Sequence, residues 1–294
     1  MAAVTASPAA RGIDWHRKSF SLLFYRAVRD LKPVWMLEDM RTMETFYEEE
    51  HAGRRIYTPS EALLYAIVHD HQAYAQYLLS RYPDEALTKP GERFCCCPSS
   101  APHAATAVRY DRRSILGLIL QQGHRAPGAS VHADGGGCFH PEDGRTPLHL
   151  ACELLRPEAA LMLLGSGASP HARDRSGLTP LDVTLEKMRE ISGRSGGDRR
   201  RCLDNLLMFT PKLDFKMRAV LDRDPQSWSR ELGEETYQYL TGRSPAPLVL
   251  ITMQTIVRQL SPRSFPDSLH ELPIPSSMKP PGLPLGQQGG RRLL

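Results

Sequence analysis

Apolar residues recur along this chain mostly at intervals of three and four, the spacing that predicts amphipathic helices rather than strands. An early stripe of this kind stops before Pro33 and predicts a helix within an N-terminal cap over residues 14–57, behind a flexible start at 1–13. Two less regular capping helices are expected at 215–221 and 228–240. The members of the early stripe are Phe20, Leu23, Phe24, Ala27, Val28 and Leu31.

One sequence segment occurs twice. Residues 143–152 read DGRTPLHLAC and residues 176–182 read SGLTPLD, so Thr146 and Thr179 lie 33 positions apart (179 − 146). A glycine before each threonine suits a turn with positive φ, and the proline after it suits the first position of a helix. This segment resembles the ankyrin repeat family, which has the same period. The resemblance implies an all-α solenoid of stacked helix pairs.

Weaker copies lie upstream, with Ala66 and Ala107 at the position of Ala151, where two helices approach closely. The spacings of 41 (107 − 66) and 44 (151 − 107) exceed 33, so we expect insertions near 84–100 and 124–142. A fourth copy begins at Thr179 and is interrupted near 192–201. The sequence therefore predicts about four ankyrin repeats over residues 58–210. A generic bundle of helical hairpins is the alternative.

The overall charge is mild. Lys and Arg total 37 against 33 Asp and Glu, a net charge of +4, which argues against a nucleic-acid binder driven by phosphate contacts. The six cysteines, three of them adjacent at Cys95–Cys97, do not form a secreted disulfide pattern. The longest charge-free apolar run, at 246–257, is far shorter than the ~20 residues that span a bilayer. These features predict a reducing cytosolic or nuclear compartment, with no membrane span.

Motifs for catalysis are weak. Residues 193–197 satisfy G-x-S-x-G, but that motif needs a preceding strand, and here a charged helical stretch precedes it. We interpret these residues as a flexible insertion, and the arginines at 199–201 as part of a solvated linker. The sequence offers no group of catalytic residues to support a third possibility, an enzyme with an active site near Trp228. We expect neither catalysis nor a cofactor.

Two groups could suggest a metal. His69, Asp70 and His71 are adjacent, but Asp70 and His71 fall at the turn between two ankyrin helices, where a histidine usually has a structural role. Cys95–Cys97 with His103 lacks the C-x-x-C spacing of a zinc site. We therefore expect no metal ligands.

The last part of the chain, residues 244–285, is a separate segment, followed by a tail at 286–294. Its pattern predicts an apolar helix introduced by two prolines, a break at Ser261-Pro262, a shorter helix ending near Leu269, and an extended strand bounded by prolines. One interpretation gives this segment a structural role only, as a last packed helix with an extended tail lying on it.

This segment resembles the SOCS box of ankyrin-and-SOCS-box proteins. The resemblance implies that the first helix docks on elongin C and that a Leu-Pro-aliphatic-Pro string contacts a cullin. The family usually has cysteine where this chain has Thr252. The elongin positions are Pro247, Leu248, Ile251, Thr252 and Ile256, and the cullin positions are Leu272, Pro273, Ile274 and Pro275.

A closer resemblance, carried by residues 30–40, 60–79, 151–158 and 269–275, is to a family of ankyrin proteins regarded as substrate receptors of cullin-RING ubiquitin ligases. It implies a non-catalytic specificity subunit that binds elongin B/C and a cullin of the cullin-5 type, with cullin-2 left open. IMP dehydrogenase is the implied target, and the cytosol the implied location, with cytoplasmic vesicles left open. A pure ankyrin scaffold without ligase recruitment is the alternative function.

Ankyrin repeats bind proteins on a concave surface made of loop tips and first helices. We therefore expect substrate contacts on the loops that precede the first helices, with the insertions at 84–100 and 124–142 as a second option. The loop residues predicted for this surface are His140, Arg145, His171, Arg173, Asp174 and Arg175.

Overall fold

The computed structural model describes residues 23–42, 57–91, 102–124, 144–190, 196–262, 265 and 267–275, and it shows helices but no strands in them. The chain divides into two compact units, residues 1–94 and 95–294. The first unit contains α2 (Val34–Thr42), α3 (Pro59–Val68) and α4 (Gln72–Arg81). The second contains α5 (His103–Arg109), α6 (Arg113–Gly123), α8 (Pro147–Glu153), α9 (Pro157–Gly165), α10 (Pro180–Glu190), α11 (Gly196–Phe209), α12 (Arg218–Leu221), α13 (Pro225–Leu232), α14 (Glu234–Thr241), α15 (Leu248–Gln259) and α16 (Asp267–His270).

The turn inside three of the helix pairs is built in the same way. A residue with φ between 53° and 57° ends the first helix, and the next N–H donates to an alanine carbonyl 2.8–2.9 Å away. This is a Schellman-type helix end, and it agrees with the predicted equivalence of the alanines. The three sets are Asp70 with His71 and Ala66, Asp111 with Arg112 and Ala107, and Leu155 with Arg156 and Ala151.

The N-terminal cap in the first unit is itself a helix pair. Residues 23–29 are helical, Leu31 has φ of 51°, and the Lys32 N–H donates to the carbonyl of Ala27 over 3.1 Å. The predicted stripe is correct for Phe24, Ala27 and Val28, which are buried. It is wrong for Leu23 and Leu31, which are 47% and 57% exposed. The helix ends at Arg29 and Leu31 lies in the turn after it, so Leu31 does not continue the buried face. Phe20 lies outside the described residues.

The first unit also buries a charge. The Arg41 side chain is fully buried, forms an ion pair with Glu38, and donates to the carbonyl of Tyr57 over 3.2 Å. The hydroxyls of Tyr82 and Tyr74 donate to the same carboxylate over 2.6 and 3.3 Å. Burial opposes ionisation of Glu38, but the hydrogen bonds from Arg41 and Tyr82 outweigh it and lower the pKa of that carboxyl.

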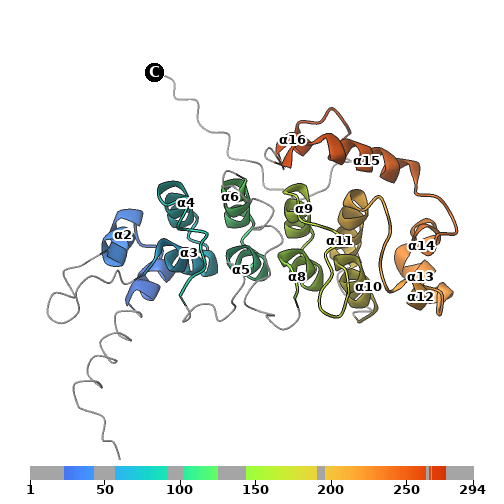
Figure 1. The fold of residues 1–294 in the computed structure, drawn as a ribbon, viewed down its shortest axis with the longest axis horizontal. Helices are drawn as coiled ribbons and strands as arrows, with labels where there is room; N and C mark the ends of the chain where they lie inside the picture. Colours follow the sequence, from blue (N-terminus) through green and yellow to red (C-terminus); the bar gives the residue numbers. More distant parts are fainter. Residues whose placement is uncertain are drawn as a thin grey trace, which may run out of the picture. The chain divides into compact units, whose positions relative to one another are not determined.

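In the second unit, α5, α8 and α10 form one row, and α6, α9 and α11 form a second row beside it (Figure 1). Thr146 and Thr179 cap α8 and α10, which begin at Pro147 and Pro180 as predicted. This double row is the all-α ankyrin solenoid that the period of 33 residues predicts.

The fourth helix pair differs from the prediction. An interruption was expected near 192–201, but α11 already begins at Gly196, so only residues 191–195 separate it from α10. The arginine run is not a solvated linker. Arg199 is buried and donates to the Met188 carbonyl over 3.2 Å, and Arg200 donates to the Leu232 carbonyl. Each of these guanidinium groups thus donates to a backbone carbonyl outside its own helix, which holds the polar run against the neighbouring structure.

Two helices, α13 and α14, occupy the region where one helix was expected over 228–240. Gly233, with φ of 77°, separates them, a conformation that residues with a side chain rarely adopt. Trp228, Leu232 and Leu240 from these helices are buried against Leu203 of α11. This cluster caps the last ankyrin helix pair.

Candidate protein-interaction surfaces

Helix α15 carries apolar side chains on both of its faces. On one face Met253, Gln254 and Val257 are buried. On the other, Leu248 and Ile251 are 78% and 45% exposed. An amphipathic surface helix normally places polar residues on its solvent side, so this outer face is unusual.

The predicted elongin positions fall largely on this outer face. Leu248, Ile251 and Thr252 are exposed, whereas Pro247 and Ile256 are half-buried. The Thr252 hydroxyl donates to the Leu248 carbonyl over 2.9 Å. When a partner covers this face, that hydroxyl therefore keeps its hydrogen bond. The loss of binding affinity expected from threonine in place of cysteine is correspondingly smaller.

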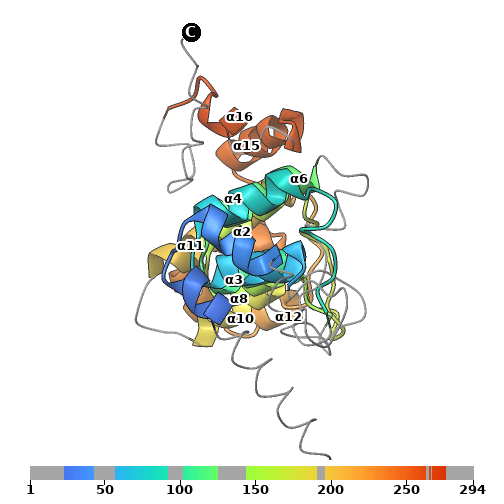
Figure 2. The ribbon, with the colours of Figure 1, turned by 90° about the vertical axis from the view of Figure 1, so that its left-hand side faces the viewer.

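The inner face fastens α15 to the end of α11. The Gln254 amide donates to the carbonyls of Leu207 and Thr210, over 2.8 and 3.4 Å. Beyond the helix, Phe265 is buried with its ring 6.3 Å from that of Phe209 and directly against Gly165. Figures 1 and 2 show α15 and α16 lying along the α9–α11 side of the double row. The terminal segment is thus packed onto the repeats, with its apolar outer face left uncovered.

A cavity of about 260 Å³ lies between α11, α14 and the start of α15. Val249 and Leu250 line it on one side, and Arg200, Asp204 and Tyr239 on the other. Burial raises the pKa of Asp204, although Arg200 forms an ion pair with it over 3.0 Å. The cavity adjoins the outer apolar face through Val249, so it could receive a side chain of a bound protein.

The predicted cullin positions lie just after α16. Leu269 is buried and anchors this end of the chain, Leu272 and Ile274 are half-buried, and Pro273 and Pro275 are exposed. The expected extended strand is wrong. Residues 271–275 bend instead, and the Ile274 N–H donates to the Leu272 carbonyl over 2.8 Å, which closes a tight turn.

The predicted substrate residues do not share one environment. Asp174 is buried, accepts a hydrogen bond from the Leu178 N–H over 2.8 Å, and lies 3.5 Å from the Arg145 guanidinium. Its carboxylate therefore holds the loop before α10. His171, Arg173 and Arg175 are exposed, whereas His140 lies outside the described residues.

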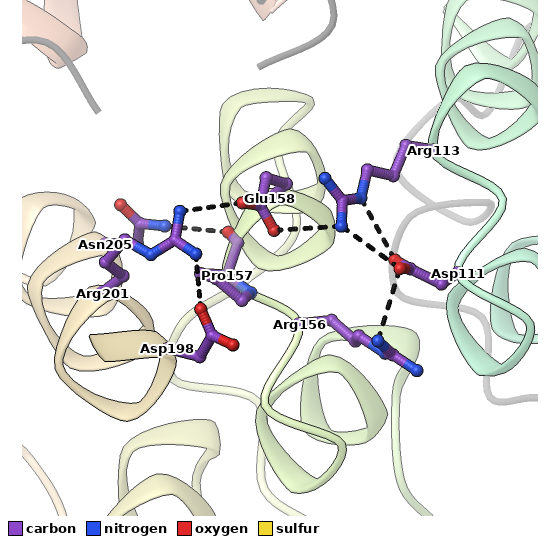
Figure 3. Close-up of polar contacts among 8 residues, drawn as sticks. All are labelled: Asp111, Arg113, Arg156, Pro157, Glu158, Asp198, Arg201 and Asn205. Atoms are coloured by element: carbon purple, nitrogen blue, oxygen red, sulfur yellow. Dashed lines mark hydrogen bonds and ion pairs between the residues drawn. The ribbon is translucent and has the colours of Figure 1, made fainter. Parts of the chain in front are cut away.

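Sequence reasoning missed a charged network that crosses three helix pairs (Figure 3). Glu158 of α9 is only 5% exposed and receives Arg201 of α11 over 2.9 Å, with Arg113 of α6 at 3.8 Å. Asp111 holds both Arg113 and Arg156, over 3.2 and 3.3 Å. These residues lie at or near the starts of the second helices. The network links the second-row helices, and a glutamate among apolar neighbours in α9 was the only signal for it.

The histidine turn is structural. The Tyr74 N–H donates to Nδ1 of His71 over 3.3 Å, so Nε2 carries the proton that it donates to the Lys32 carbonyl over 2.9 Å. Within the described ranges, no group of three or more metal-binding side chains comes together. In the same ranges, no helix is both long enough and apolar enough to cross a membrane.

Comparison with known proteins agrees with this architecture. The family model for the ankyrin repeat matches residues 143–175. Mouse ankyrin repeat domain-containing protein 9 is 42% identical to this chain in an alignment that covers 90% of this chain and 89% of the relative. Two shorter matches concern part of this chain. Human neurogenic locus notch homolog protein 4 is 51% identical over 18% of this chain and 3% of the relative. The Arabidopsis regulatory protein NPR5 is 45% identical over 26% of this chain and 14% of the relative.

Proposed function

Because this chain belongs to the family of ankyrin repeat domain-containing protein 9, we propose that it is a non-catalytic substrate-recognition subunit of a cullin-RING ubiquitin ligase. Its ankyrin repeats are of a class that acts in protein–protein interaction. In the proposed role the repeats hold a target, while the terminal segment recruits elongin B/C and a cullin. The chain then contributes proximity, because it raises the effective concentration of the target near the ubiquitin-loaded enzyme.

One observation carries this proposal: the apolar outer face of α15. Leu248 and Ile251 lie one turn apart on a helix whose opposite face is already fixed to α11. A helix that lays such a face into a groove is a common mode of recognition, and it needs no rearrangement of the repeats. The adjoining cavity beside Val249 adds space for a partner side chain.

The proposed partners follow the resemblance to SOCS-box proteins. Elongin C would contact Leu248, Ile251 and Thr252, and a cullin of the cullin-5 type, with cullin-2 as the alternative, would contact the exposed Pro273 and Pro275. IMP dehydrogenase is the target that the family resemblance implies. This role would place the chain in the cytoplasm.

The alternative is an ankyrin scaffold that binds a partner without a ligase. The packed inner face of α15 favours it, because a terminal repeat needs a covering helix for solubility. A scaffold, however, gives no reason for Leu248 to be 78% exposed. The two functions differ in whether α15 binds elongin.

A pull-down tests the proposal. The tagged chain is recovered from cell lysate and probed for elongin C and a cullin, beside Leu248→Asp and an alanine block over residues 272–275. Leu248 is the first residue of α15, where an acidic side chain suits the helix dipole, so the substitution leaves the helix intact. Gln226→Asp, which adds the same charge at an exposed position of α13, is the matched control.

We expect wild type and the control to recover both proteins. Leu248→Asp should lose elongin C together with the cullin, and the alanine block should lose the cullin alone. Recovery of neither protein by wild type would contradict ligase recruitment and leave the scaffold function. Equal recovery by Leu248→Asp would show that α15 is not the binding helix.

A further inference from the structure

Three loops of the second unit lie side by side at the starts of α8, α10 and α12. The Arg145 guanidinium reaches Asp174 over 3.5 Å, and Arg173 reaches Asp214 over 2.8 Å. Lys216 donates to the Ser176 carbonyl. These contacts join the loops around residues 144–146, 169–178 and 211–217 into one surface.

This surface carries more basic than acidic side chains, and we name the basic ones the basic rim. Its two carboxylates are already engaged. Asp174 is buried and bonded to the Leu178 N–H, and Asp214 is bonded to Arg173. The basic rim comprises Arg145, His171, Arg173, Arg175, Lys212 and Lys216.

The Asp214 carboxyl lies in the positive electrostatic field of nearby basic side chains. The hydrogen bond and the charge of Arg173 lower the pKa of its carboxyl, and His171 and Lys212 lower it further. Basic side chains from two loops thus act on one exposed carboxylate. An additional anion brought to this surface would meet the same positive potential.

The basic rim is also partly preorganised. Arg145 is fixed by Glu153 over 2.9 Å, and Arg173 donates to the Gly177 carbonyl over 3.0 Å. Arg175 and Lys212 are exposed, and neither forms a hydrogen bond or ion pair with the described residues. Fixed cations reduce the entropy lost on binding, and Arg175 and Lys212, which have no such partner among the described residues, can form new ion pairs.

We propose that the basic rim is the docking surface for an acidic segment of a partner protein, in which several Asp or Glu side chains lie close together. The inference rests on the proposed role of the repeats in binding a partner, and it is independent of elongin recruitment. It names the chemistry of that partner: carboxylates in a loop or tail that can lie across the loops before α8 and α10.

The number of available cations favours a protein segment over a nucleic acid. Binding to nucleic acid grows with the number of phosphates neutralised, so a surface with few available cations binds it weakly. Half of the basic rim, namely Arg145, Arg173 and Lys216, is already bonded within the chain. The whole chain has a net charge of only +4. A short carboxylate-rich segment matches this small number of available cations.

The test uses the full-length chain and a short fluorescein-labelled peptide of glutamate and serine, with binding followed by fluorescence anisotropy. A glutamine and serine peptide is the uncharged probe, and a single-stranded oligonucleotide is the nucleic-acid probe. The variant Arg175→Glu with Lys212→Glu reverses the charges of these two exposed side chains. Arg230→Glu with Arg258→Glu makes the same charge change at exposed positions on α13 and α15.

We expect the acidic peptide to bind wild type and the Arg230, Arg258 control, and to bind the rim variant about tenfold more weakly. Absence of peptide binding to wild type would overturn the proposal. An equal loss of peptide affinity in the rim variant and in the Arg230, Arg258 control would also overturn it. Tighter rim-dependent binding of the oligonucleotide would also overturn it.

A second measurement on the same samples separates this inference from the proposed function. Purified elongin B/C is added to wild type and to the rim variant, which should bind it equally. If elongin B/C binds neither protein while the acidic peptide still binds, the ligase role fails and the basic rim stands. If elongin B/C binds both while the peptide does not, the basic rim fails and the ligase role stands.

Discussion

The ring of Phe265 lies in the space that a side chain at Gly165 would occupy, so the terminal segment rests on α9 at a position where only glycine leaves room. Gly165 is the last residue of α9, and Phe265 is 5% exposed. This contact and the Gln254 bonds to α11 join the proposed adaptor segment to the repeats. The terminal segment is therefore part of the folded stack.

Gly165→Ala should loosen this joint. The added methyl group displaces the Phe265 ring, and we expect a loss of about 1–3 kcal/mol in the free energy of unfolding, with faster amide exchange in α15. Chemical denaturation and hydrogen exchange check both. Gly117→Ala is the control, because its added methyl group would meet only the flexible end of Met162, 3.2 Å away. Wild-type exchange in the Gly165 variant would refute the joint.

The charged network of Figure 3 should contribute measurably to stability. Arg201→Ala leaves Arg113, 3.8 Å away, as the remaining ion-pair partner of the buried Glu158 carboxylate among the described residues. We expect a loss of about 1–3 kcal/mol, because a buried charge loses its partner. Adding Glu158→Gln to this variant should restore part of the lost free energy of unfolding. A double-mutant cycle, measured by urea denaturation, checks this.

The exposed pair of Lys187 and Glu190, 2.7 Å apart, provides the comparison. Lys187→Ala should cost less than about 0.5 kcal/mol, because solvent screens this pair. An Arg201 variant as stable as the Lys187 variant would show that the network adds nothing to the stack.

The stability of the first unit should depend on pH through Glu38. Its pKa is lower in the folded state than the usual value of 4.5, so its contribution is complete above pH 4.5 and disappears as the pH falls through the lowered folded value. Glu38→Gln should therefore cost about 2 kcal/mol at neutral pH and progressively less below pH 4.5. Urea denaturation at several pH values measures this difference.

Tyr82→Phe is the matched variant for this test. It keeps the ring that lies 4.8 Å from the Arg41 guanidinium and removes only the hydroxyl that donates to Glu38 over 2.6 Å. The difference between its stability and that of wild type should also shrink at acid pH. A cost for Glu38→Gln that is the same at pH 7 and pH 3 would be evidence against the buried pair.

Two cysteines should resist alkylation in the native protein. Cys152 and Cys202 are buried, and burial raises the pKa of the Cys152 thiol to about 12 and raises that of Cys202 as well. The thiolate is the reactive form, so native labelling at neutral pH should be about a thousandfold slower than in urea. Mass spectrometry after brief iodoacetamide treatment measures this, and equal labelling in both conditions would contradict the burial.

Much of the fold was predictable because it depends on local chemistry. The Thr-Pro starts at 146 and 179 set the helix caps, and the small residue at Ala66, Ala107 and Ala151 marks each helix pair. The charge-free, mostly apolar run at 246–257 likewise indicated the helix that became α15. These signals lie within a few residues of the features that they specify.

The rest depended on partners distant in the sequence. The arginines at 199–201 were interpreted as a linker because their acceptors, such as the carbonyls of Met188 and Leu232, are fixed only by folding. Asp174 was expected at the substrate surface, but its carboxylate is used inside its own loop. The fit of Phe265 against Gly165 joins residues 100 positions apart (265 − 165), and no local pattern reveals it.

The central claim is that the outer face of α15 binds elongin, and calorimetric titration of purified elongin B/C into the full-length chain tests it most directly. We predict saturable binding by wild type and by Gln226→Asp, and binding at least about tenfold weaker for Leu248→Asp, since a buried charge replaces an apolar contact. Absence of heat with wild type, or equal affinity in Leu248→Asp, would contradict the claim.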